Sequence, residues 1–179
     1  MDISRHGWYS LYQSRPAYPA GTAGAGVLVE PTNKRTRSMR RQVIYENGVN
    51  HCFGCGPTNA SGLRLSFIET DDGVEVEYTV PAHLQGASGI VHGGIQATLL
   101  DETLCMTAYA KAGAPVFTGE LTVRYLRPVP TVTPLRVHGR IVEAKSKGWI
   151  IEGAITLAGS AEELTRARGR FFAQQQASN

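Results

Sequence analysis

The sequence predicts an α+β protein in which one long helix packs on a mostly antiparallel sheet of five or six strands. Residues 95–111 lie in the longest segment free of glycine and proline, and such a segment favours a helix. Short runs before and after it are separated by glycine, proline and aspartate, as in antiparallel strands joined by turns. Because only one helix is available, the strands must bury one face against it.

The elements follow in the order of two strands, the helix and further strands. Leu63, Leu65 and Phe67 alternate with polar residues, and the turn 71–73 separates this run from a strand at 74–80, a hairpin pattern. Glycines mark 81–91 as a loop before the helix. The strands expected after the helix cover 116–127, 135–144, 149–158 and 164–174.

Composition indicates a single core and excludes several functional classes. The chain has 179 residues, of which 42% are hydrophobic and 18% charged, enough for one domain. A net charge of +3 is too small to indicate nucleic-acid binding. Apolar runs fall short of the ~18 residues of a membrane span. No secretory signal is recognised, and three cysteines fit a reducing compartment, so we expect a cytoplasmic protein.

The N-terminal segment differs from the rest in charge. Residues 1–41 hold seven basic and two acidic residues, together with several prolines and glycines. We therefore expect residues 1–45 to form an arm without its own core, and residues 46–179 to form the domain. An organelle presequence is the alternative for this basic arm, although proline and glycine oppose the amphipathic helix that it needs.

The helix carries two adjacent carboxylates, Asp101 and Glu102, in an otherwise apolar stretch. Such groups are costly unless they are paired, exposed to a cavity or used in a reaction. His92-Gly93-Gly94 leads directly into the helix. Backbone N–H groups left open at a helix start can stabilise a developing oxyanion. This combination favours Asp101 as the functional acid, with Glu102 as the second candidate.

One helix cannot bring both features to the same carbonyl group. Gly93 and Asp101 lie eight residues apart, or about 12 Å along a helix. A base and its oxyanion donor both need to lie within ~3 Å of the reacting atoms, or one water molecule away. Two antiparallel copies could each supply one half, so the spacing predicts a symmetric dimer with composite sites.

The run from Gln85 to Glu102 resembles the hotdog-fold acyl-CoA thioesterases of the phenylacetic-acid-pathway and thioesterase-superfamily type. Cys52–Leu63 is similar to the segment that opens many bacterial members, and Arg124–Pro130 is similar to the strand exit of the family. The resemblance covers roughly residues 50–173 and implies the hotdog fold, in which a sheet wraps one central helix.

The resemblance also implies roles at matching positions. Asp101 falls where the family places its general base or nucleophile, and Gly93, with Gly94 beside it, where a backbone N–H polarises the thioester carbonyl. His92 matches the motif histidine that orients the site. Thr118 matches a Ser or Thr contributed across the interface to hold the attacking water or the carboxylate.

The residues that would bind the substrate match the family less closely. Gln85 lies near a family Asn or Gln close to the thioester, and Arg124 and Lys147 match positions that contact the coenzyme. Arginine and lysine suit its phosphates. Leu99, Met106 and Phe117 could line an acyl pocket between two central helices, or equally serve as core.

Cys52 and Cys55 form a C-x-x-C with His51 adjacent, a pattern that also occurs in zinc sites. A structural zinc site needs four ligands, usually as two pairs, and no second pair exists in the sequence. We therefore expect no metal and interpret the segment as a cap over the first strand. Cys105 is interpreted as a small buried hydrophobe.

Together these features predict an acyl-CoA thioesterase without a metal or redox cofactor, active as a homodimer or a dimer of dimers. Acyl carrier protein is an alternative carrier of the thioester, and neither a nucleic-acid partner nor a membrane span is expected. Two other functions stay open: a non-catalytic acyl-CoA sensor, and a hydratase or dehydratase that acts on the acyl chain.

Overall fold

The computed structural model describes residues 41–44, 50–146 and 148–174. The predicted arm therefore lies outside the described residues, apart from 41–44. Among the described residues, no helix combines the length and apolar character needed to cross a membrane.

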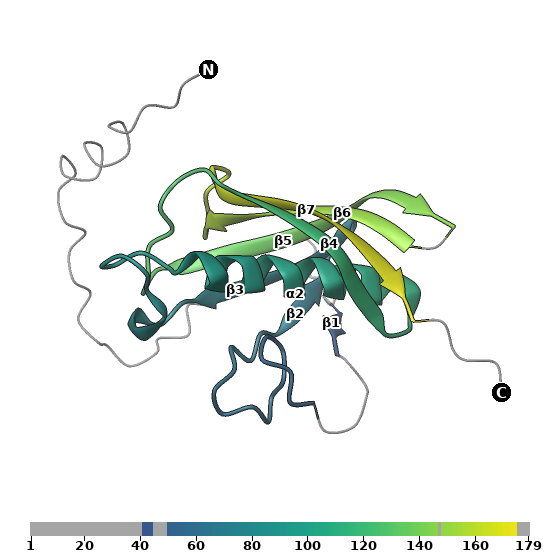
Figure 1. Ribbon diagram of the computed structural model, residues 1–179, viewed down its shortest axis with the longest axis horizontal. Helices are drawn as coiled ribbons and strands as arrows, with labels where there is room; N and C mark the ends of the chain where they lie inside the picture. The colour runs from purple at the N-terminus through teal and green to yellow at the C-terminus, as the bar shows by residue number, and fades with distance from the viewer. Residues whose placement is uncertain (1–40, 45–49, 147, 175–179) are drawn as a thin grey trace, which may run out of the picture. The chain divides into compact units, whose positions relative to one another are not determined.

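One α-helix, one short 3-10 helix and seven strands make up the described fold (Figure 1). In chain order they are β1 (Gln42–Val43), β2 (Phe67–Glu69), β3 (Gly73–Thr79), the short 3-10 helix η1 (Ala82–Leu84), α2 (Gly93–Ala112), β4 (Val116–Tyr125), β5 (Pro134–Lys145), β6 (Gly148–Leu157) and β7 (Glu163–Ala173). The strands form one sheet in the order β1-β2-β3-β5-β6-β7-β4, and every pairing is antiparallel. The α+β prediction is confirmed, with seven strands in place of five or six.

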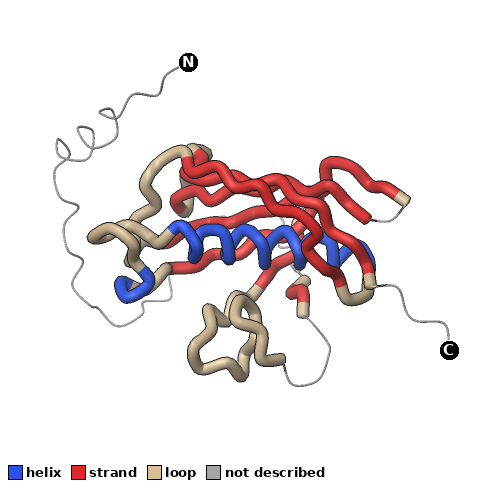
Figure 2. The backbone as a smooth tube through the Cα atoms, viewed as in Figure 1, coloured by secondary structure: helices blue, strands red, loops and turns tan. Residues whose placement is uncertain are grey.

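The additional strand is β1, a two-residue strand that pairs with β2 and lies inside the range assigned to the arm. The last four predicted strands match β4 to β7 within a few residues. Figure 2 shows α2 running lengthwise along one side of the sheet, with contacts to β3 through β7.

The prediction of an extended strand at Leu63–Phe67 is wrong, because β2 begins only at Phe67. The backbone N–H groups of Leu63 and Leu65 donate to Phe53 O and Gly54 O. Arg64 between them has a φ of 54°, which interrupts an extended run. The alternation of this segment still predicts burial correctly, since Leu63 and Leu65 belong to the core.

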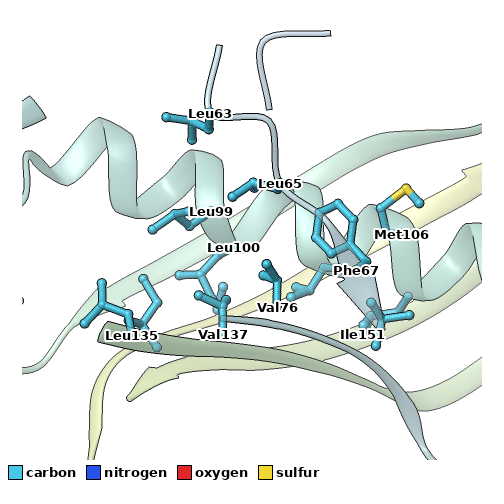
Figure 3. Packing of buried hydrophobic residues seen from close by; sticks show 14 of the residues in the cluster. Leu63, Leu65, Phe67, Val76, Leu99, Leu100, Met106, Leu135, Val137 and Ile151 are labelled. Carbon is cyan, nitrogen blue, oxygen red and sulfur yellow. The ribbon is translucent and has the colours of Figure 1, made fainter. Parts of the chain in front are cut away.

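The core lies between α2 and the inner face of the sheet, and the 50–66 segment closes it on one flank. Figure 3 shows Leu63 and Leu65 beside Leu99 of α2, with Leu135, Val137 and Ile151 of the sheet across the core. All six are buried. The helix is thus enclosed on the sheet side and on the side of the 50–66 segment.

Glycines let α2 approach the sheet closely at one point. A Cβ atom at Gly139 would lie 2.6 Å from Thr107 Oγ1, and one at Gly153 would lie 2.6 Å from Leu104 Cδ1. Gly139 and Gly153 are cross-strand partners on β5 and β6. This contact sets the height of the helix above the sheet, and a methyl group would force the two apart.

We expect Gly139→Ala to lower the free energy of unfolding by about 1–3 kcal/mol, because its methyl group overlaps Thr107. Combining it with Thr107→Ala removes the obstructing oxygen, so the double variant should recover part of that loss. Urea denaturation of the two single variants and the double variant measures the coupling. Strictly additive losses would show that the close approach is not the cause.

Candidate functional site

The residue that precedes α2 caps the start of the helix. His92 caps the helix with extended backbone angles, φ −56° and ψ 139°, and its Nδ1 accepts a hydrogen bond of 3.0 Å from Gly94 N. The ring nitrogen thus satisfies one of the open donors of the first turn. His92 therefore organises the helix start, and the Gly94 N–H is committed to it.

Gly93 is the donor that remains available. Within the part of the chain that the structure describes, its N–H donates no hydrogen bond, while its carbonyl accepts one of 3.0 Å from Tyr125 Oη on β4. Tyr125 was not predicted as a site residue, since no motif marks it. The bond fixes the first turn of α2 against the edge strand and leaves the Gly93 N–H open to a ligand.

Asp101 lies two turns further along α2 and also reaches β4. Thr118 Oγ1 donates to Asp101 Oδ1 at 2.8 Å. Thr118 adjoins a register shift between β4 and β7, at Thr118/Glu120. The resemblance implied a Thr acting across a subunit interface, whereas here the bond forms within one chain. It orients the carboxylate and leaves Oδ2 without a donor among the described residues.

β4 runs back along α2, so these two features lie at separate points of the same edge. Tyr125 meets the helix at Gly93, and Thr118 meets it at Asp101. The eight-residue separation noted in the sequence is therefore retained, at about 12 Å. The open N–H and the carboxylate do not form one site within a single chain.

Among the described strands, none pairs with the outer side of β4. β4 ends the sheet, and Phe117 and Tyr125 on it are 58% and 48% exposed. Leu99 and Met106, the other two residues expected to line an acyl pocket, are buried in the core. Phe117 pairs with the exposed Phe172, whereas its neighbour Thr118 pairs with Phe171, which is buried in the core. Phe117 therefore lies on the outer face of the sheet, away from α2, and none of the three residues offers exposed apolar surface on the α2 side.

Glu102 points to the other flank of α2. Its Oε1 accepts a bond of 3.2 Å from Cys52 Sγ in the 50–66 segment. A Cβ atom at Gly54 would lie 2.1 Å from Glu102 Cγ, so the carboxylate lies directly on that backbone. The two adjacent acids thus serve different neighbourhoods, and Glu102 is not at the edge where Asp101 lies.

The thiols near these acids are strongly affected by burial. Desolvation raises the pKa of Cys105 to about 12, with Glu102 and Asp101 as further causes. Desolvation and then Glu102 raise the pKa of Cys55 to about 12. Cys105 is therefore a neutral thiol. It is half-buried against the core rather than fully buried, and its Sγ lies 3.7 Å from Val116 O.

Gln85 supports the loop before the helix. Its Oε1 accepts a bond of 2.9 Å from Gly89 N, and its backbone forms an isolated bridge with Val91. The amide oxygen is therefore engaged locally. Lys147 lies outside the described residues.

Arg124 lies on the outer face of the sheet, at the rim of a hollow of about 450 Å³. It is the direct cross-strand partner of Arg166, and neither guanidinium has an acidic partner among the described residues. Like charges opposite each other on neighbouring strands are unfavourable. Two such arginines form a suitable contact for a phosphate group.

His138 lines the same hollow. Its Nδ1 is buried without a hydrogen-bond partner among the described residues. Burial lowers the pKa of this imidazole, with Arg136 as the second cause. Burial thus favours the neutral form of the ring, and no sequence motif indicates a role for it.

Comparison with known proteins agrees with this architecture. Residues 88–163 match the family model described as the thioesterase superfamily. Acyl-coenzyme A thioesterase THEM4 of Rattus norvegicus is 29% identical over 90 residues, which cover 50% of this chain and 38% of that protein. The chain thus spans less than half the length of this curated relative.

Solved structures share the fold. A crystal structure described as a thioesterase superfamily protein has a TM-score of 0.62 and 30% identity, covering 70% of this chain and 61% of the other. A Bacillus halodurans protein crystallised with CoA has a TM-score of 0.51 and 27% identity, covering 56% of this chain and 66% of that one. The resemblance to hotdog-fold thioesterases is confirmed, and residues 88–163 carry the segment characteristic of the thioesterase superfamily.

Proposed function

We propose that this protein hydrolyses an acyl-CoA thioester to a free acid and CoA at sites shared between two copies of the chain. The observation that carries the proposal is the pair of features along one exposed edge. Asp101 is oriented by Thr118, and the Gly93 N–H at the helix start is open. The name of the THEM4 relative supports the same reaction class.

In this mechanism Asp101 acts as a general base. Thr118 holds Oδ1, and Oδ2 takes a proton from a water molecule as the water oxygen bonds to the thioester carbonyl carbon. The carbonyl π electrons move onto oxygen, where the Gly93 N–H of the other copy and the helix dipole stabilise the negative charge. The intermediate then collapses, the C–S bond breaks, and the CoA sulfur leaves with the proton returned by Asp101.

The exposed edge supports the shared site. Two copies of β4 pairing antiparallel about a two-fold axis would extend the sheet and set the two α2 helices antiparallel. Gly93 of each helix would then face Asp101 of the other.

The coenzyme is proposed to reach over the edge to the outer face. Arg124 follows Thr118 by six residues, or roughly 20 Å of strand. The Arg124–Arg166 pair would bind phosphate groups, while the acyl thioester lies on the helix side of β4. Acyl carrier protein presents the same pantetheine arm without the adenosine phosphates, so these arginines favour the free coenzyme.

We expect Asp101→Asn to lower the rate of thiol release from acyl-CoA by ~10²-fold or more, because an amide cannot accept the proton. Glu120→Gln is the matched control, an exposed acid on β4 changed in the same way, and its rate should stay near wild type. The release of thiol from a panel of acyl-CoA substrates, followed with a thiol reagent, provides the measurement.

Activity that survives in Asp101→Asn would move the base to Glu102. Acyl-CoA that raises the melting temperature without release of thiol would identify a sensor. Product of altered mass with CoA still attached would identify a hydratase or dehydratase.

Shared sites predict complementation between two inactive variants. Gly93→Pro removes the open N–H at the first helical position, where proline is tolerated, and the His92 ψ of 139° suits a residue before proline. Mixed with Asp101→Asn in equal amounts, it should restore about a quarter of the wild-type rate, because half of the dimers carry one intact site. Mixed dimers verified by native mass spectrometry that remain inactive would show that each chain holds its own site.

Phosphate recognition predicts a change that depends on the carrier. Arg124→Ala should raise the KM for acyl-CoA by about tenfold or more, as expected for a lost charge-assisted contact. The KM for the same acyl group on pantetheine, which lacks the nucleotide, should stay unchanged. Arg127→Ala is the matched control, since Arg127 is already paired with Glu162 at 2.5 Å. An equal effect of Arg124→Ala on both carriers would exclude phosphate recognition at this position.

A further inference from the structure

The 50–66 segment brings two cysteines to the side of α2 that faces away from β4 and Asp101. One ligand atom from each of Cys52, Cys55 and Glu102 lies within 4.8 Å of the other two, and all three residues are half-buried. The sequence contains no second pair of Cys or His that would complete a metal site with the C-x-x-C. The fold supplies a helix carboxylate instead, from 47 residues further along the chain.

Local hydrogen bonds hold the cysteines in this arrangement. Gly56 N donates to Cys52 O at 2.9 Å and closes the C-x-x-C turn. Asn50 Oδ1 accepts from Cys52 N at 2.9 Å, and Asn50 Nδ2 lies 3.6 Å from Cys55 Sγ. An N–H directed at a sulfur is the outer contact that supports a metal-bound thiolate. The two sulfur atoms are therefore positioned before any ligand binds.

Glycine at position 54 allows the third group to approach. Any side chain there would overlap the Glu102 carboxylate, and Gly54 itself is fixed to the core through its bond with Leu65 N, at 2.9 Å. Among the described residues, the donors that meet the Glu102 carboxylate are thiols. A half-buried carboxylate with only weak thiol donors gains from a nearby cation.

We propose that Cys52, Cys55 and Glu102 bind one Zn²⁺ ion. Two thiolates and one carboxylate are a borderline-soft donor set that suits zinc and excludes the oxygen-seeking Mg²⁺ and Ca²⁺. A tetrahedral ion with three protein ligands takes water in its fourth position. Binding releases the two thiol protons to solvent and leaves the protein atoms otherwise unchanged.

The ion would join the 50–66 segment to the middle of α2, one residue from Asp101. A disulfide between the two cysteines would instead use both sulfur atoms and leave Glu102 without its thiol donors. All three cysteines are free in the structure. The zinc proposal is independent of thioester hydrolysis, because Glu102 and Asp101 face different neighbours.

The test uses the full chain without a histidine tag, purified from zinc-supplemented cells and dialysed. Elemental analysis should find about one zinc per chain. After removal of zinc with a chelator, Co²⁺ titration should give a sulfur-to-metal charge-transfer band that saturates at the same ratio. Cys52→Ser and Cys55→Ser should lose the stoichiometric metal and the band, and Glu102→Gln should weaken binding. Cys105→Ser is the matched control and should keep both.

A measurement on the wild-type chain guards against variants that fail to fold. Zinc should protect Cys52 and Cys55 from alkylation, as followed by mass spectrometry, and should leave the modification of Cys105 unchanged. Absence of stoichiometric zinc and cobalt binding by the wild-type protein would overturn the proposal. So would loss of metal in Cys105→Ser equal to that in Cys52→Ser, or an intact mass lower by two hydrogens that identifies a disulfide.

Discussion

The close approach of α2 to the sheet at Gly139 and Gly153 is the constraint on which the remaining arrangement depends. A helix seated on two glycines has its rotation about its own axis fixed by Leu104 and Thr107, which fill the space above them. Neighbouring helix positions differ by about 100°. Asp101 is thereby turned toward β4 and Glu102 toward the 50–66 segment, and two adjacent acids avoid sharing one environment.

Most of the fold could be predicted from the sequence, because periodicity, glycines and prolines are local signals. The helix at 93–112 and the four strands after it follow these signals closely. The strand predicted at Leu63–Phe67 is wrong for a physical reason. An alternating pattern shows which side chains are buried, but it does not show which backbone groups form the hydrogen bonds. There the partners are Phe53 and Gly54 rather than a neighbouring strand.

Only part of the candidate site could be predicted from the sequence. Carboxylates in an apolar helix and glycines at its start are unusual enough to be recognised, so Asp101 and Gly93 emerged from the sequence. Thr118 was indicated only by the family resemblance and Tyr125 by no motif, because both act through tertiary contacts that β4 makes as it returns along the helix. Glu102 lies beside two distant cysteines only because of the orientation of α2 about its own axis, and no local sequence pattern predicts that orientation.

The exposed edge strand β4 affects how the newly synthesised monomer behaves. Ten residues of strand end the sheet, and an unpaired strand is a template for any extended segment that reaches it first. Pairing with a second copy, as proposed above, would therefore compete with aggregation after synthesis. The register shift beside Thr118 bends this template, so that only a strand with matching curvature pairs along its full length.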